Sequence, residues 1–123
     1  MPITGAAALI IVWTRVYASI YGVDPAFALA VAHVESRTAH QEFRVGLIGG
    51  RYYAPYAIHK DFMRLRGWPV DTLQGNIEAG VRALRGSSHR AVLRRYNREF
   101  TEDYYRAVEL AAKEYRRKLA YHE

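Results

Sequence analysis

The chain has 123 residues, half of them apolar and 24% charged, which is the size and composition of one globular domain and excludes an intrinsically disordered chain. It has no cysteine, so neither a disulfide framework nor a thiolate metal site can form. The formal net charge is +6, and 15 of the 18 basic residues are arginine, which favours a polyanionic partner such as nucleic acid, an anionic membrane or an acidic wall polymer.

Two helices are predicted at the start of the chain. The apolar run 6–13 lacks a basic start and a cleavage site, and it is short for a membrane span. We therefore expect a core-facing helix over about 4–21, and neither an ordinary export signal nor a transmembrane segment. Asp24 and Pro25 then begin a second helix to residue 35, whose nearly continuous apolar sequence indicates burial.

A short β-element and four further helices are predicted in the rest of the chain. Apolar alternation and a glycine pair over 42–58 indicate a short hairpin or a glycine-rich loop. Cap residues and helix terminators predict helices over about 59–66, 71–86, 87–96 and 101–120. The sequence thus predicts a mainly helical α+β fold, with residues 1–123 forming a single domain.

Glu35 is the strongest candidate for a catalytic residue. It ends the apolar helix, and Ala28, Val31 and Ala32 share its face. Desolvation and the negative end of the helix dipole both disfavour the charged carboxylate, so we expect a raised pKa. A carboxyl group that keeps its proton near neutral pH can act as a general acid on a glycosidic bond. The alternative is a helix-terminal glutamate that reaches water or pairs with Arg37.

Four stretches of the chain, in this order, carry a resemblance to a known family. Residues 21–36 have a Tyr-Gly-Val-Asp-Pro lead-in, an apolar helix and a Glu-Ser pair. Residues 54–58 (Ala-Pro-Tyr-Ala-Ile) fall where the family has Gly-Leu-Met-Gln-Ile. The third stretch, residues 76–84, is similar to the family's Asn-Ile-x-Ala-Gly helix. The fourth stretch has two parts: residues 95–97 are similar to the Ala-Tyr-Asn motif, and residues 104–108 to the closing Tyr-Val-x-x-Val motif. Together they resemble the lysozyme-like soluble lytic transglycosylases, which share their fold with goose-type lysozyme.

Two departures from the family pattern concern the substrate. Ala57 stands where the family has its glutamine, and an alternative registration, which places 46–49 at that motif, lacks the glutamine as well. After Asn97 the family continues with Ala-Gly, whereas this chain has Arg98 and Glu99.

The resemblance implies a peptidoglycan lytic transglycosylase that needs no cofactor. Its single glutamate, here Glu35, protonates the oxygen between N-acetylmuramic acid and N-acetylglucosamine. The resulting carboxylate then deprotonates the primary hydroxyl of the muramic acid, which closes on the anomeric carbon and leaves an anhydro end. Hydrolysis requires a second carboxylate, for which Glu42 and Asp61 are candidates. A lysozyme of the same fold, a non-catalytic wall-binding module and a DNA-binding helical domain are the alternatives.

Six further residues are candidates for substrate contacts. Three tyrosines of the glycine-rich segment have rings that can stack on sugar faces, with hairpin packing as the alternative. The resemblance places another tyrosine hydroxyl near the glutamate and the substrate, an asparagine in the following loop, and a serine that orients the carboxyl group or caps the helix. These residues are Tyr52, Tyr53 and Tyr56, then Tyr96, Asn97 and Ser36.

The expected partner is the peptidoglycan glycan strand, without nucleic acid or metal. His33 and His40 have no zinc-motif spacing with Glu35. The arginine strip over 90–98 is predicted to be a solvated helix face, with polyanion binding as the alternative. A wall-cleaving chain that starts at Met1 without an export signal fits a phage protein carried in the virion, or a domain of a longer protein, so other virion or wall-machinery proteins are further expected partners.

Overall fold

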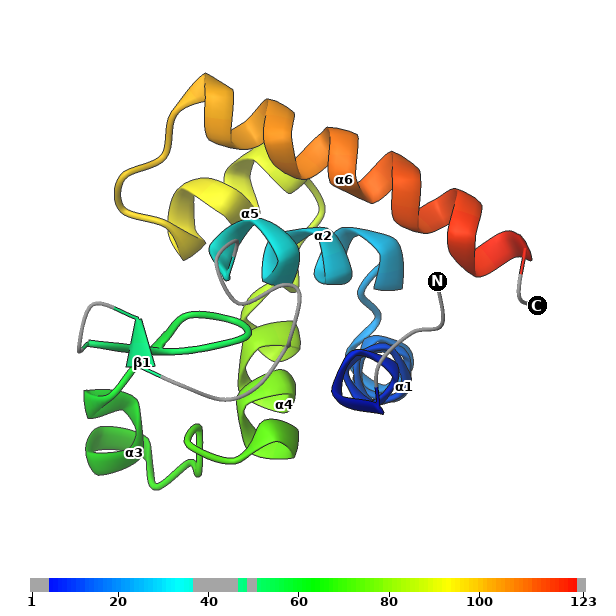
Figure 1. The fold of residues 1–123 in the computed structure, drawn as a ribbon. Helices are drawn as coiled ribbons and strands as arrows, with labels where there is room; N and C mark the ends of the chain where they lie inside the picture. Colours follow the sequence, from blue (N-terminus) through cyan, green and yellow to red (C-terminus); the bar gives the residue numbers. More distant parts are fainter. Residues whose placement is uncertain (1–4, 37–46, 49–50, 122–123) are drawn as a thin grey trace.

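The computed structural model describes residues 5–36, 47–48 and 51–121, and this part of the chain is mainly helical, as predicted (Figure 1). Its helices are α1 (Gly5–Tyr21), α2 (Pro25–Glu35), α3 (Asp61–Arg66), α4 (Leu73–Ala83), α5 (His89–Tyr96) and α6 (Glu102–Tyr121). Three two-residue strands form an antiparallel sheet in the order β1 (Leu47–Ile48), β2 (Tyr52–Tyr53) and β3 (Ile58–His59). The predicted β-element is therefore present, although 42–46 and 49–50 lie outside the described residues.

Side-chain caps set where the helices begin. Asp24 accepts a hydrogen bond from the N–H of Ala26 at 3.0 Å, as expected for the start of α2. The cap of α4 is Thr72, whose Oγ1 accepts from the N–H of Gly75 at 3.1 Å. The helix predicted over about 71–86 is therefore present but shorter, beginning at Leu73 and ending at Ala83, because the threonine hydroxyl takes the capping position.

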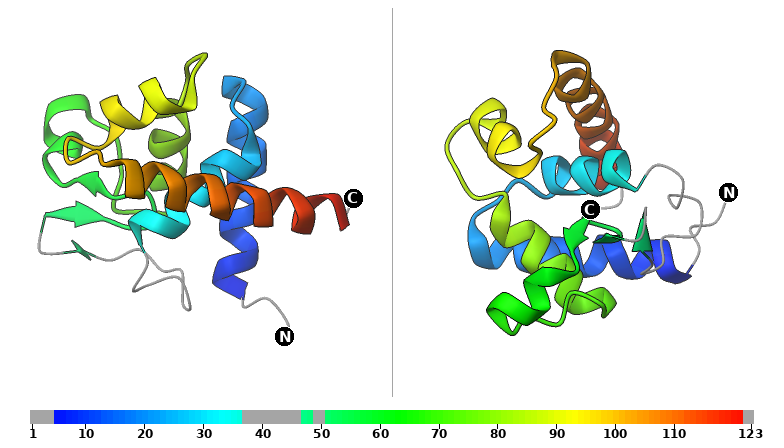
Figure 2. Two further views of the ribbon diagram at one scale, coloured as in Figure 1. Left: turned by 90° about the horizontal axis from the view of Figure 1, so that it is seen from above. Right: turned by 90° about the vertical axis from the view of Figure 1, so that its left-hand side faces the viewer.

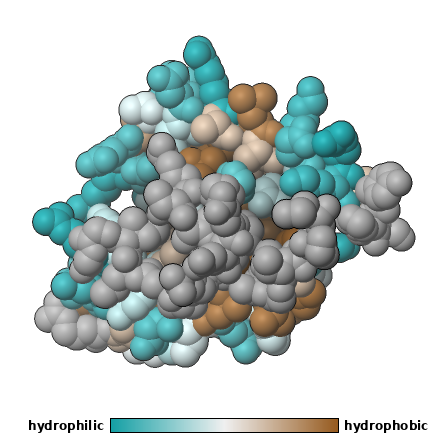
Figure 3. Space-filling view, viewed as in Figure 1, coloured by the Kyte–Doolittle hydropathy of each residue, from teal (hydrophilic) through white to brown (hydrophobic). Residues whose placement is uncertain are grey.

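Helix α2 lies between α6 and α1 (Figures 1 and 2). It packs against α6 on one side and α1 on the other, and α1 also packs against α4. Residues 26–32 of α2 are all buried, because its sequence offers no polar face to solvent. The exposed positions of α6 are mostly charged, and hydrophilic side chains predominate along the upper rim of Figure 3, where this helix runs.

Helix α1 buries only one of its faces. Its buried Thr14 hydroxyl has a partner in the Tyr56 hydroxyl at 2.8 Å. The opposite face exposes a stripe of apolar side chains at helical spacing, Leu9, Val12, Val16 and Ile20. No helix in the described part of the chain combines the length and apolar character needed to cross a membrane, in agreement with the sequence.

Asn76 of α4 joins the helices to the sheet. Its side chain is fully buried and accepts a hydrogen bond from the N–H of Tyr56 at 3.0 Å. Its amide nitrogen donates to the carbonyl oxygens of Tyr53 and Val70, both at 2.9 Å. One turn further along α4, Gly80 lies against the ring of Tyr56, where an added Cβ would overlap the ring. The backbone around Tyr56 is thus held tightly against α4.

Candidate functional site

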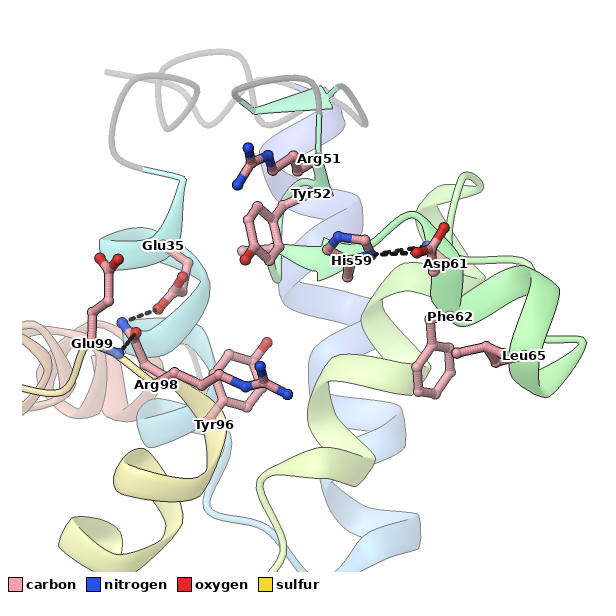
Figure 4. Close-up of a pocket in the computed structure, with 12 residues that line it drawn as sticks. Glu35, Arg51, Tyr52, His59, Asp61, Phe62, Leu65, Tyr96, Arg98 and Glu99 are labelled. Atoms are coloured by element: carbon pink, nitrogen blue, oxygen red, sulfur yellow. Dashed lines mark hydrogen bonds and ion pairs between the residues drawn. The ribbon is translucent and has the colours of Figure 1, made fainter.

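A cleft of about 800 Å³ separates the end of α2 from the sheet and α3 (Figure 4). One wall comes from the end of α2 and the segment that closes α5: Glu35, Tyr96, Asn97, Arg98 and Glu99. The other comes from the sheet, its last turn and α3: Arg51, Tyr52, Ala57, His59, Asp61, Phe62 and Leu65. A volume of this size lies within the usual range of small-molecule sites.

The carboxyl group of Glu35 accepts hydrogen bonds from the neutral side chains of Tyr104 and Asn97 at the cleft. Glu35 is the last residue of α2 and is partly buried. Its Oε1 accepts a hydrogen bond from the Tyr104 hydroxyl at 2.6 Å and from Nδ2 of Asn97 at 3.4 Å. The buried α2 thus carries the carboxyl group out of the core at the negative end of the helix, as the sequence predicts.

Two tyrosine hydroxyls close to Glu35 have raised pKa values. Burial, first, and then the charge of Glu35 and the hydrogen bond to it raise the pKa of Tyr104 far above its usual value. Burial and the charge of Glu35 likewise raise the pKa of Tyr96. The Tyr96 hydroxyl donates to the carbonyl oxygen of Tyr56, so the hydroxyl that reaches Glu35 is that of Tyr104 and not that of Tyr96.

Three of the predicted substrate contacts do not line the cleft. The prediction for Tyr56 is wrong, because its side chain is fully buried and forms part of the core. For Ser36 the capping alternative holds: it is 1% exposed, caps α2 and donates its hydroxyl to the Ala32 carbonyl at 2.6 Å. Tyr53 is partly buried against the core, so the packing alternative holds for two of the three tyrosines.

Tyr52, Tyr96 and Asn97 line the cleft. Tyr52 is 42% exposed, and its ring lies edge-on to that of His59 with 5.3 Å between centroids. Asn97 has two roles. Its Oδ1 accepts from the N–H of Glu99 at 2.9 Å, which holds the turn after α5, while its amide nitrogen reaches Glu35.

Asp61, one of the two candidates for a second carboxylate, lies on the wall opposite Glu35 (Figure 4). Its Oδ2 is 3.7 Å from Nδ1 of His59, and its backbone N–H donates to the same nitrogen at 3.1 Å. The other candidate, Glu42, lies outside the described residues.

Ala57 lines the cleft at the position where the resemblance places a glutamine. Its backbone has a φ of 56°, in the left-handed region that side chains other than glycine rarely adopt. The methyl group has no polar atom, so this position cannot form the hydrogen bonds of a glutamine side chain. The alternative registration places 46–49 at the glutamine motif, and of these residues Gly46 and Gly49 lie outside the described part of the chain.

The arginine strip on α5 is largely engaged within the fold. Arg90 pairs with Glu102, Arg94 lies 5.3 Å above the ring of Phe100, and Arg95 donates to two carbonyl oxygens near the end of α4. Arg98 alone among the four lines the cleft. These contacts tie α5 to its neighbours, so the strip is less available to a polyanion than its sequence implies.

Of the two histidines considered as metal ligands, the structure describes His33. His33 lies edge-on to the ring of Tyr115, with Nδ1 at 3.4 Å from its hydroxyl. His40 lies outside the described residues, and among those described no three potential metal ligands come together.

Comparisons with known proteins found no relative. No protein-family model matches the chain, and searches of curated proteins and of solved structures found no match. The fold and the site together define a mainly helical domain with a hydrogen-bonded carboxyl group in a cleft.

Proposed function

We propose that this protein is a peptidoglycan lytic transglycosylase with a lysozyme-like fold. It would cleave the β-1,4 bond between N-acetylmuramic acid and N-acetylglucosamine and leave an anhydro end. The observation that carries the proposal is the carboxyl group of Glu35, held by Tyr104 and Asn97 at the wall of a cleft of about 800 Å³. The sequence motifs point to the reaction, and the cleft offers room for several sugars.

In the proposed reaction one carboxyl group acts twice. Protonated Glu35 gives its proton to the bridging oxygen as the bond from that oxygen to the anomeric carbon breaks, and N-acetylglucosamine leaves with a 4-hydroxyl group. The carboxylate then accepts the proton of the muramic acid C6 hydroxyl as its oxygen bonds to the anomeric carbon. Glu35 is protonated again, and no water is consumed. The two donors on Oε1 stabilise the carboxylate between these steps.

The walls of the cleft suit a glycan. Tyr52, Phe62 and Tyr96 contribute rings, and aromatic faces stack on the apolar faces of sugars. Because the Tyr52 hydroxyl and the neighbouring polar side chains offer donors and acceptors, the same walls can also bind sugar hydroxyls. The basic net charge suits an anionic wall polymer.

Hydrolysis by a lysozyme of the same fold is the second candidate function, and Asp61 favours it. Glycoside hydrolysis commonly uses two carboxyl groups that flank the bond, about 5–10 Å apart. Asp61 faces Glu35 across the cleft and is paired with His59. A carboxylate on the wall opposite the general acid can activate a water molecule if the two carboxyl groups flank the bound linkage.

The ends of the products distinguish the two reactions. Purified peptidoglycan is digested with the wild type, Glu35→Gln and Asp61→Asn, and the fragments are identified by mass spectrometry. We expect anhydro ends from the wild type and from Asp61→Asn, and no cleavage by Glu35→Gln. Reducing ends that disappear in Asp61→Asn would instead identify a hydrolase, and intact strands with every variant would favour the wall-binding module.

Replacing Tyr104 with phenylalanine should lower kcat by about 10- to 100-fold, because a hydrogen bond to a charged group contributes about 1.5–3 kcal/mol. The carboxylate of Glu35 loses a donor, which favours its protonated form. Since a general acid must be protonated, the alkaline limb of the pH–rate profile should move to higher pH, while KM changes little. The control is Tyr105→Phe on the same helix, which keeps the ring beneath Arg90. An unchanged pH profile in Tyr104→Phe would contradict the proposed role.

A further inference from the structure

Two arginines of the cleft differ from Arg90 and Arg95 of α5. Arg51 precedes β2 on one wall, and Arg98 follows α5 on the other; both are exposed. Within the described part of the chain, neither guanidinium group has a hydrogen-bond or ion-pair partner, whereas Arg90 and Arg95 each have one. Their side chains contribute little to the fold and are available to a ligand in the cleft.

The two guanidinium groups lie on either side of the candidate catalytic residue. In the view of Figure 4, the guanidinium group of Arg51 lies above the level of Glu35 and that of Arg98 lies below it. An extended ligand that passes Glu35 would therefore meet a cation at both ends.

The cleft contains acidic as well as basic side chains, so its arginines would recognise an anion through direct contacts and not through an overall positive charge. Glu35, Asp61 and Glu99 also line it, so its overall charge does not attract anions in general. A guanidinium group, however, binds a carboxylate through two parallel hydrogen bonds, which depends on local geometry more than on the net field. Arg51 and Arg98 thus suit carboxylate groups presented at two separate places along a ligand.

We propose that Arg51 and Arg98 bind carboxylate groups carried by muramic acid residues on either side of Glu35, so that the protein selects glycan strands with anionic substituents. This inference rests on the proposed function. Muramic acid occupies every second position of the strand, so its substituents recur on both sides of a cleaved bond. The carboxylates belong to the stem peptides or, where these are missing, to the lactyl groups.

Binding measurements test the inference without cleavage. Soluble glycan strands are prepared with intact stem peptides, with the peptides removed, and with all carboxylates converted to neutral amides. Their Kd values are measured by calorimetry with Glu35→Gln and with double variants that add Arg51→Gln or Arg98→Gln. We expect each arginine change to weaken binding of a carboxylate-bearing strand about fivefold, the upper range for an exposed ion pair, and to leave the amidated strand unaffected. The carboxylate-bearing strand that responds identifies the stem peptide or the lactyl group as the ligand.

The matched control is Arg117→Gln, which removes one exposed charge from α6, outside the cleft. It should leave all affinities unchanged, and circular dichroism checks the fold of every variant. Equal losses on carboxylate and amidated strands, or no loss on either, would overturn the inference.

Cleavage by the single variants separates this inference from the proposed function. With Glu35 present, Arg51→Gln and Arg98→Gln should raise KM for carboxylate strands about fivefold at unchanged kcat. Cleavage that does not respond to either arginine would overturn the inference alone. Carboxylate-dependent binding without any cleavage by the wild type would overturn the proposed function and leave the carboxylate sites standing.

Discussion

Glu35→Gln is expected to reduce the rate of peptidoglycan cleavage by at least about a thousandfold, because general acid–base catalysis by a positioned side chain contributes about 10²- to 10⁴-fold and this residue acts in both proton transfers. Glutamine has the same size and keeps an oxygen that accepts from Tyr104, so the fold should be retained. The rate is measured by release of soluble fragments from purified sacculi, with thermal unfolding as the check on stability.

The matched control is Glu99→Gln, which removes a second carboxyl group from the same wall of the cleft. Glu99 is exposed and contributes its backbone N–H, not its side chain, to the turn that Asn97 holds. Its rate should stay within a few-fold of the wild type. If Glu35→Gln retained a rate within tenfold of the wild type, or if both variants lost activity equally, Glu35 would not be the proton donor.

Asn76→Ala is expected to lower the free energy of unfolding by about 3–5 kcal/mol, because each buried polar group left without a partner costs about 1–3 kcal/mol. The substitution leaves three such groups, the N–H of Tyr56 and the carbonyl oxygens of Tyr53 and Val70. A change of this size is a large part of the about 5–15 kcal/mol that stabilises a typical domain. Urea denaturation followed by circular dichroism measures it.

Gln74→Ala on the same helix provides the comparison. Gln74 is exposed and donates one hydrogen bond, to the Tyr17 hydroxyl at 2.7 Å, so its loss should cost about 1 kcal/mol or less. If Asn76→Ala were no more destabilising than Gln74→Ala, the buried amide would not hold the sheet to α4. Asn76→Ala should also disturb the candidate site, because the Tyr56 carbonyl accepts a hydrogen bond from Tyr96 and the neighbouring Ala57 lines the cleft.

Local sequence was sufficient to predict the helices. A cap forms between residues two or three apart, so Asp24 could be recognised as the start of α2 from its own neighbours. The uninterrupted apolar sequence of α2 likewise predicted its burial, and therefore that Glu35 leaves the core at its end. The first residue of α4 could not be predicted from local sequence, because Asp71 and Thr72 are both good cap residues. Which of them caps the helix depends on the path of the preceding loop, and in the structure it is Thr72.

Side chains that meet across the fold were predicted less well. Tyr56 was read as a sugar-binding ring, and nothing in its neighbourhood reveals that it lies beneath Gly80 and reaches Thr14 on α1. The motif at 104–108 assigns no role to Tyr104, although its hydroxyl donates to Glu35, 69 residues earlier in the chain. Asn76 likewise lies between Gln74 and Glu78 in the sequence, and only the tertiary structure shows that its side chain is fully buried.

By itself, the amino-acid sequence determined the mainly helical class, most helix boundaries and the position of Glu35 at the end of a buried helix, because these depend on caps and periodicities between residues a few positions apart. Only the tertiary structure decided which groups hold that carboxyl group, which tyrosines form the core, and which arginines remain available to a ligand. These depend on contacts between residues that the packing of α2, α4, α5 and α6 brings together from distant parts of the chain.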